Sequence, residues 1–164
     1  MKIRSADLPD APQIAEIYNY YIASSHATFE VDQIDAVETE SRMRNVIDRG
    51  YPFFVAEEND EIAGYAYGHQ FRERQAYRHS IEVSVYVKPG WERRNIGTNL
   101  YEALFAEIKK GDFRAIIAGI SLPNDASVRL HERFGMKKVA HFREVGRKFD
   151  RWIDVGYWEL ILAK

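Results

Sequence analysis

Cysteine is absent from the 164 residues, which excludes disulfides, thiolate metal sites and cysteine nucleophiles. No apolar run approaches the ~18 residues that would span a membrane, and the opening MKIRSADLPD lacks the apolar core of a secretory signal, so we expect a cytoplasmic location. Net charge is also nearly absent, because 23 basic residues offset 25 acidic ones to leave −2. We therefore expect no nucleic-acid partner and no membrane partner.

The residues that are present suit an ordinary globular protein, with 46% hydrophobic and 29% charged side chains. The length fits one domain over 1–164. Residue spacing predicts a strand, two helices, three strands, a helix, a strand, a short helix and two strands joined by a polar loop. That order predicts a mixed α/β domain, with parallel pairing only around the two later helices.

The stretch VYVKPGWERRNIGTNLYEAL joins an alternating strand to a helix. The helix begins near Asn95, and a helix amino terminus offers N–H groups and the positive end of a dipole to a phosphate. Arg93 and Arg94 would add mobile positive charge beside it. The stretch contains neither a P-loop nor a Rossmann glycine motif. A solvated basic surface loop is the alternative interpretation.

The segment PNDASVRLHERFGM predicts a short capped helix. Asn124 can cap this helix or bind a ligand, and Ser127 and His131 follow at intervals of about one turn. We expect Leu130 and Phe134 to take the buried side, which leaves His131 facing a cleft. A structural or exposed histidine is the alternative.

Together, SVYV, ERRNIG, PNDASVRLHERFGM and VGRKFDRWIDVGYWEL resemble the GNAT N-acetyltransferase superfamily, and within it the phosphinothricin and methionine sulfoximine acetyltransferases. The resemblance covers nearly the whole chain. It implies a single GNAT-type domain whose central, mostly antiparallel sheet has a splayed parallel pair and is flanked by helices. It also implies acetyl-CoA as co-substrate, no metal, and a homodimer.

The family's pyrophosphate-binding pattern falls on residues 92–97 of this chain. Glu92 stands where the family usually has Gln or Arg, and Asn95 replaces the first glycine. Asn is the non-glycine residue that best tolerates positive φ, so we expect Asn95 to be left-handed. The resemblance implies that the cofactor-binding residues are Val85, Tyr86, Val87, Arg93, Arg94, Asn95, Ile96, Gly97, Thr98, Asn124, Ser127 and Arg133.

The reaction that the resemblance implies is direct attack of a substrate amine on the acetyl thioester. Glu82 occupies the family's base position and would act through one or two waters. The alternative for Glu82 is a strand carboxylate that faces solvent or pairs with Arg78. His131 stands where a tyrosine usually protonates the departing thiolate, and an imidazole near pKa 6.5 can also share the role of base.

Arg72 and Arg74, in the loop FRERQAYRHS, are spaced to bind a carboxylate or phosphinate, or else belong to a solvated loop. The resemblance implies that the substrate-binding residues are Phe29, Glu30, Arg72, Glu73, Arg74, Glu82, Val83 and Ser84. Other candidates, for the pocket wall, the core or a dimer contact, are Tyr77, Lys148 and Trp152.

The expected function is acetylation of the α-amine of a small amino-acid-like substrate, such as phosphinothricin, methionine sulfoximine or methionine sulfone. One alternative is another amine, such as a polyamine or a protein amino terminus. A second alternative is a non-catalytic CoA-binding sensor, although the presence of both Glu82 and His131 argues against it.

Overall fold

The computed structural model describes residues 1–163. Its seven strands hydrogen-bond in the order β1-β2-β3-β4-β5-β7-β6, and the predicted mixed α/β class, with a mostly antiparallel sheet, is confirmed. The elements are β1 (Lys2–Ser5), η1 (Leu8–Asp10), α1 (Ala11–Ser24), α2 (Ala36–Asp48), β2 (Phe53–Glu58), β3 (Glu61–Gln70), η2 (Gln75–Tyr77), β4 (Ser80–Val87), α3 (Ile96–Lys110), β5 (Ala115–Leu122), α4 (Asp125–Arg133), β6 (Lys137–Lys148) and β7 (Arg151–Ile161).

Parallel pairing occurs at the first of the two later helices. β4 runs parallel to β5 from Ser80↔Ala115 to Glu82↔Ile117. At the second helix the expectation was wrong, because β7 lies between β5 and β6 and pairs antiparallel with both. The predicted polar loop before β7 is a two-residue turn, with φ of 51° and 54° at Phe149 and Asp150. Such a tight turn places β7 directly beside β6.

The chain divides into two compact units, and β4 contributes to both. The first unit comprises residues 1–20, 34–69 and 83–112. The second comprises residues 21–33, 70–82 and the chain from Phe113 onward. Glu82 therefore belongs to the second unit and Val83 to the first.

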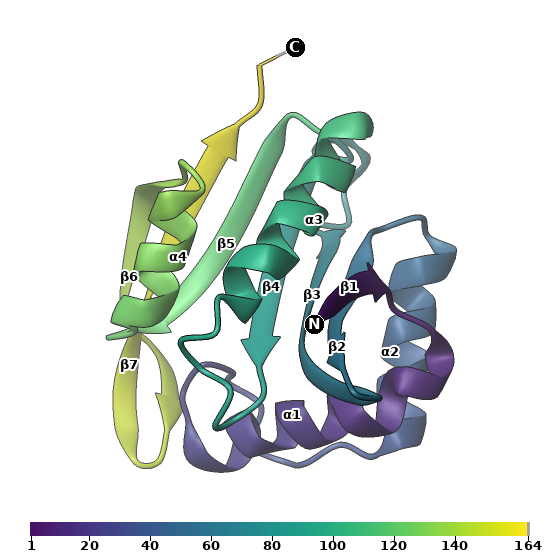
Figure 1. Cartoon of the computed structure of the whole chain (residues 1–164). Helices are drawn as coiled ribbons and strands as arrows, with labels where there is room; N and C mark the ends of the chain where they lie inside the picture. Colours follow the sequence, from purple (N-terminus) through teal and green to yellow (C-terminus); the bar gives the residue numbers. More distant parts are fainter. Residues whose placement is uncertain (164) are drawn as a thin grey trace. The chain divides into compact units, whose positions relative to one another are not determined.

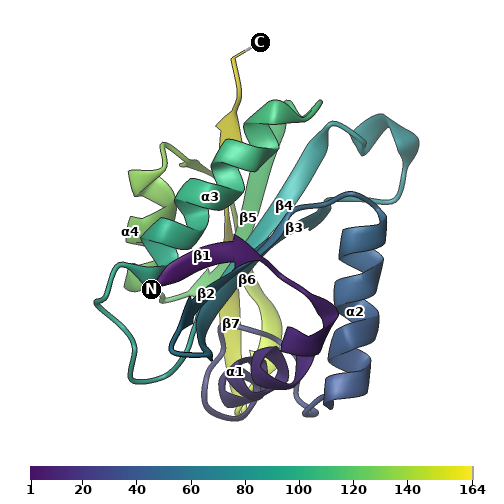
Figure 2. The ribbon, with the colours of Figure 1, turned by 45° about the vertical axis from the view of Figure 1, so that its right-hand side comes forward.

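The first unit has its sheet strands between helices. α3 buries Leu100, Tyr101 and Leu104 completely and packs against β1 and β2, whereas α2 lies on the opposite side of these strands (Figure 2). Asp35 caps α2 by accepting a hydrogen bond from the N–H of Glu38 at 2.8 Å. This cap stabilises the start of a helix whose sequence pattern is only weakly amphipathic.

Within the first unit, Gly64 lets β3 approach β4 closely. A β-carbon at position 64 would lie 2.8 Å from the Tyr86 carbonyl oxygen and 3.3 Å from Val87 Cα. Because main-chain atoms cannot move aside as a flexible side chain can, any larger residue here would push β3 away from β4.

In the second unit, α4 packs against β5, as Figure 1 shows. Trp158 on β7 is buried and donates a hydrogen bond from Nε1 to Glu132 Oε1 at 3.3 Å. Since strand side chains alternate, Trp158 and Tyr157 lie on opposite faces of β7. None of the helices within residues 1–163 is long and apolar enough to cross a membrane.

Candidate active site

In the first unit, two consecutive bends connect β4 to α3. Trp91 N–H donates to the Lys88 carbonyl at 3.0 Å, and Gly90 has φ +82°, as the third position of a type II turn after proline requires. Asn95 then has φ 60° and ψ 18°. The prediction that Asn95 adopts the left-handed conformation is confirmed, and Arg93, at φ 63°, adopts positive φ as well.

The left-handed residue places the start of α3 at Ile96. Asn95 makes no side-chain hydrogen bond to the first turn of α3. The first-turn N–H groups and the dipole of this 15-residue helix are therefore presented to an anion without competition from that side chain. Ile96 itself is 2% exposed, so only its main chain, not its side chain, can serve a ligand.

The charged side chains of this segment are partly engaged. Arg94 Nη2 pairs with Glu58 Oε2 at 2.6 Å, and its guanidinium lies over the Trp91 ring, 4.3 Å from the centroid. The expectation that Arg94 is mobile was therefore wrong, because an ion pair and a ring contact hold it. Glu92 is exposed and accepts a hydrogen bond from Gly90 N–H at 3.2 Å. Its carboxylate thus bonds within the preceding turn.

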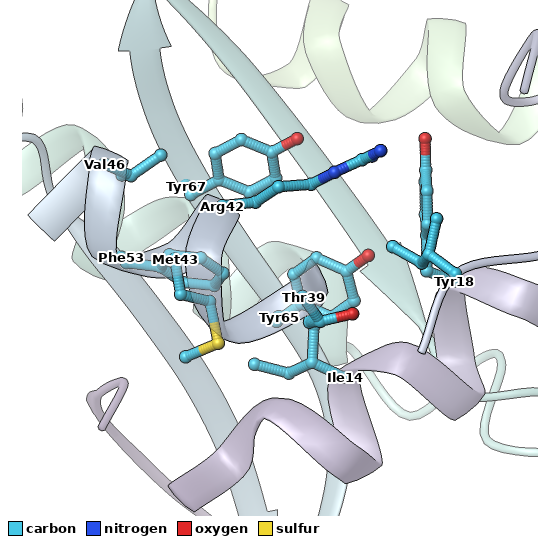
Figure 3. A pocket seen from close by; sticks show the side chains of 10 residues that line it. Ile14, Tyr18, Thr39, Arg42, Met43, Val46, Phe53, Tyr65 and Tyr67 are labelled. Carbon is cyan, nitrogen blue, oxygen red and sulfur yellow. The ribbon is translucent and has the colours of Figure 1, made fainter. Parts of the chain in front are cut away.

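The first unit also holds a pocket between α1, α2 and the strands β2 and β3 (Figure 3). Tyr18 and Tyr65 both contact the Tyr86 ring, with centroids 5.3 Å apart in each case. The pocket was not predicted from the sequence, although the alternating tyrosines in GYAYG indicate one aromatic face of a strand. The lining residues are Ile14, Tyr18, Ile34, Thr39, Arg42, Met43, Val46, Phe53, Tyr65 and Tyr67.

In the second unit, the predicted cap of α4 is confirmed. Asn124 accepts a hydrogen bond from Ser127 N–H at 3.2 Å. The expected orientation of the helix was wrong, because His131 is only 3% exposed and Leu130 and Phe134 are half-buried. Asn124, Ser127 and His131 lie about one turn apart on the same face of α4. This face is directed toward the protein interior, so His131 is buried.

Burial lowers the pKa of the His131 imidazole, and its hydrogen bond to the Ser127 main chain acts in the opposite direction. His131 Nδ1 lies 2.7 Å from the Ser127 carbonyl oxygen. A carbonyl only accepts, so Nδ1 carries the proton. A neutral imidazole with its proton on Nδ1 is better suited to accept a proton at Nε2 than to donate one.

This burial makes folding sensitive to acid. Because the folded pKa of His131 lies below the unfolded value of about 6.5, the unfolded chain takes up the proton first as the pH falls. We expect the stability associated with neutral His131 to be complete above pH ~6.5 and to decrease below it. Unfolding midpoints from pH 8 to pH 5 should therefore fall less in His131→Gln than in the wild type. An equal fall in both would contradict this, and His69→Gln is the control.

Glu82 lies beside Gly119 in the second unit. Gly119 of β5 is exposed although it lies in the middle of a central strand. A β-carbon at position 119 would lie 3.6 Å from Glu82 Oε1 and 3.4 Å from Tyr157 Cζ. The carboxylate and the phenol ring therefore flank the same point, above a residue that has no side chain. Tyr157 was not singled out from the sequence, where it is one tyrosine of ten.

Arg72 lies on the exposed arginine loop. Burial and the Glu82 carboxylate raise the pKa of Tyr157, whereas the Arg72 charge lowers it. Arg72 also lies over the Phe71 ring, 5.0 Å from its centroid. Glu73 and Arg74 are exposed, and the structure shows no contact that draws them to Glu82 within residues 1–163.

Lys148 anchors the loop that carries Phe29 and Glu30. Its side chain is buried, with 4% of the residue exposed, and Nζ donates to the carbonyls of Tyr21, Ser25 and Thr28 at 3.4, 2.7 and 2.9 Å. Burial lowers the pKa of this ammonium and the nearby Glu30 carboxylate raises it. Lys148 is thus an anchor for the loop, not the wall residue that the sequence suggested.

The Phe29 ring occupies the space that a side chain at Gly146 would fill. Phe29 is nevertheless 40% exposed. Arg133, Tyr77 and Trp152 are all exposed. The second unit therefore brings Glu82 and Tyr157 together at Gly119, and holds Phe29 and Glu30 on an anchored loop.

Known proteins match nearly the whole chain. The sequence model of the acetyltransferase (GNAT) domain matches residues 3–156. A phosphinothricin N-acetyltransferase of Streptomyces coelicolor is 38% identical and covers 97% of this chain and 95% of its own. An L-methionine sulfoximine/L-methionine sulfone acetyltransferase of Salmonella typhimurium is 35% identical, with coverage of 99% and 95%. The solved structure of a phosphinothricin acetyltransferase of Sinorhizobium meliloti in complex with acetyl-CoA has a TM-score of 0.95 at 31% identity, and the match covers 99% of this chain and 88% of that one.

This chain belongs to the GNAT acetyltransferase family and is an N-acetyltransferase. Within the family it is similar to the enzymes named for phosphinothricin and for methionine sulfoximine.

Proposed function

We propose that this N-acetyltransferase transfers the acetyl group of acetyl-CoA to the α-amine of a small amino-acid-like substrate, such as phosphinothricin, methionine sulfoximine or methionine sulfone. The observation that carries the proposal is the position of the Glu82 carboxylate, whose Oε1 lies with the Tyr157 phenol around the exposed Gly119. An amino acid carries an ammonium and a carboxylate two bonds apart. Glu82 suits the ammonium as a base, and Arg72, on the loop before β4, is the group proposed for the carboxylate.

The first unit contains features that fit the acetyl-CoA pyrophosphate. The left-handed Asn95 and the first turn of α3 present N–H groups to an anion, and Arg93, Gly97 and Thr98 complete the turn. The main chain of 85–87 would face the pantetheine arm. Bound acetyl-CoA supplies a thioester whose carbonyl carbon accepts the amine and whose sulfur leaves.

Glu82 would remove a proton from the substrate ammonium through one or two waters, since only the neutral amine attacks a thioester. Burial lowers the pKa of the His131 imidazole, which makes it a weaker base than an exposed histidine. We assign the role of base to Glu82, with His131 sharing proton transfer.

Asn95 provides a test of the turn. Replacing Asn95 by glycine keeps positive φ at no steric cost, whereas valine disfavours it by about 1–2 kcal/mol. We expect Asn95→Gly to keep the KM for acetyl-CoA within about twofold and Asn95→Val to raise it by about tenfold. Steady-state thiol release measures both. Equal KM values for the two variants would show that the left-handed conformation is not used for binding.

We further propose that two copies form a homodimer in the cytoplasm through β6, the last strand in the sheet order. Several large apolar side chains of this hairpin are exposed, as an edge strand that meets a second copy would require. They are Val139, Phe142, Val145, Phe149 and Trp152. The whole of 1–164 would act as one domain.

The function is tested by an acetylation screen that follows thiol release from acetyl-CoA. The amines are phosphinothricin, methionine sulfoximine, methionine sulfone, methionine, spermidine and a peptide with a free amino terminus. We expect turnover of the amino acids. Turnover confined to spermidine or the peptide would assign another amine. Acetyl-CoA binding by calorimetry without turnover of any amine would indicate a non-catalytic sensor.

A further inference from the structure

Tyr157 lies in the second unit beside Glu82, which already has a proposed role. The edge of its ring that bears the hydroxyl is close to Gly119, because a β-carbon there would lie 3.3 Å from Cε1 and 3.4 Å from Cζ. The ring also packs edge-on against Phe142, with centroids 5.7 Å apart. These contacts fix the ring and leave the hydroxyl as its one polar group.

The Tyr157 hydroxyl has no protein hydrogen-bond partner within residues 1–163. Its ring is half-buried, and a phenol in such a place normally finds a partner. Gly119 beside it is exposed, so the point that the phenol and the Glu82 carboxylate flank faces solvent. The structure thus combines a fixed donor with a position that solvent reaches.

The charges around Tyr157 indicate which group of the ligand it meets. Glu82 attracts the ammonium and repels a carboxylate, whereas Arg72 attracts the carboxylate. Burial and Glu82 raise the pKa of the phenol, so it stays a neutral donor under alkaline conditions, where more of the amine is deprotonated. A neutral donor can bind a carboxylate next to Glu82 without the repulsion that a second acceptor would suffer.

We propose that Tyr157 is a specificity-determining residue whose hydroxyl donates a hydrogen bond to the α-carboxylate of the amino-acid substrate, next to Arg72. The inference rests on the proposed function. The closeness of the phenol to Glu82 favours the α-carboxylate over a side-chain oxygen, because the α-carboxylate is two bonds from the amine and a sulfone oxygen is farther along the chain. Amines without a carboxylate are then disfavoured.

The test compares Tyr157→Phe with the wild type on L-methionine sulfone, L-methionine and the amine formed by decarboxylating methionine sulfone. Phenylalanine keeps the ring contacts with Gly119 and Phe142 and removes only the hydroxyl. Losing a hydrogen bond to a charged group should raise KM by about 10- to 100-fold for both amino acids. The KM of the decarboxylated amine and the unfolding midpoint should not change. Tyr20→Phe, at an exposed tyrosine, is the matched control.

The double variant Tyr157→Phe/Arg72→Gln adds a second measurement, the combined increase in KM. A purely structural role of Tyr157 would not couple this increase to the Arg72 substitution. If the two groups bind one carboxylate, the combined KM increase should differ from the product of the single ones for amino acids alone. A higher KM for methionine sulfone without a higher KM for methionine would overturn the proposal. It would show that the hydroxyl binds the sulfone of the substrate side chain instead of the α-carboxylate. Unchanged KM values with an active wild type would overturn it and leave the function standing. A wild type that acetylates no amino acid would overturn both.

Discussion

Glu82→Gln is expected to lower kcat by about 10²- to 10⁴-fold with an amino-acid substrate, which is the range for loss of a general base. Glutamine has nearly the same shape but cannot take up the ammonium proton. Glu82 Oε1 lies beside the exposed Gly119, and the substitution removes the base at this point while keeping the size of the side chain. The KM for acetyl-CoA and the unfolding midpoint should therefore stay close to those of the wild type.

Thiol release measured from pH 6 to pH 10 checks this prediction. The deficit of Glu82→Gln should shrink at alkaline pH, since more of the free amine then arrives deprotonated. Glu102→Gln, an exposed carboxylate on α3, controls for the charge change. Full turnover of Glu82→Gln combined with an inactive His131→Ala would reverse the assignment and make His131 the base.

Lys148→Met should destabilise the fold by about 3–5 kcal/mol, the range for breaking a buried charged group's hydrogen bonds. Methionine fills a similar volume but leaves the carbonyls of Ser25 and Thr28 without their donor. The loop that carries Phe29 and Glu30 should then lose its fixed position. We expect a higher KM for the amino acid and an unchanged KM for acetyl-CoA.

Urea unfolding and steady-state kinetics check the Lys148 prediction together. Lys137→Met, at an exposed position of the same strand, is the matched control and should change neither quantity. If Lys148→Met were as stable as this control, the three carbonyl contacts would contribute nothing measurable. A stable variant with a raised amino-acid KM would assign Lys148 to the substrate instead of to the loop.

Sequence patterns over a few residues predicted a turn conformation, a helix cap and the alternation of a strand, because neighbouring residues determine these features. The left-handed Asn95 was predictable because it stands where the resembled family has a glycine, and asparagine tolerates positive φ. The cap at Asn124 was predictable because its acceptor reaches an N–H only three residues away. The alternation of β4 placed Glu82 and Val83 on opposite faces, and Val83 is buried.

Contacts between distant segments produced the errors and omissions. Helical spacing groups His131 with Asn124 and Ser127 but does not say whether that face meets the sheet, and it does. Arg94 looked mobile because its partner, Glu58, lies 36 residues earlier in the chain. β7 was not expected between β5 and β6 because strand order depends on pairing over long separations.

The sequence by itself determined the order of helices and strands, the family, and the residue types of the chemistry: a carboxylate at 82, an imidazole at 131 and guanidinium groups at 72 and 74. These follow from local spacing and from motifs, which are properties of consecutive residues. Only the tertiary structure decided that Tyr157 and Gly119 join Glu82, that Lys148 holds the loop of Phe29, and that His131 is buried, which lowers the pKa of its imidazole. Strand pairing and burial bring these residues together, and both depend on parts of the chain that no local pattern connects.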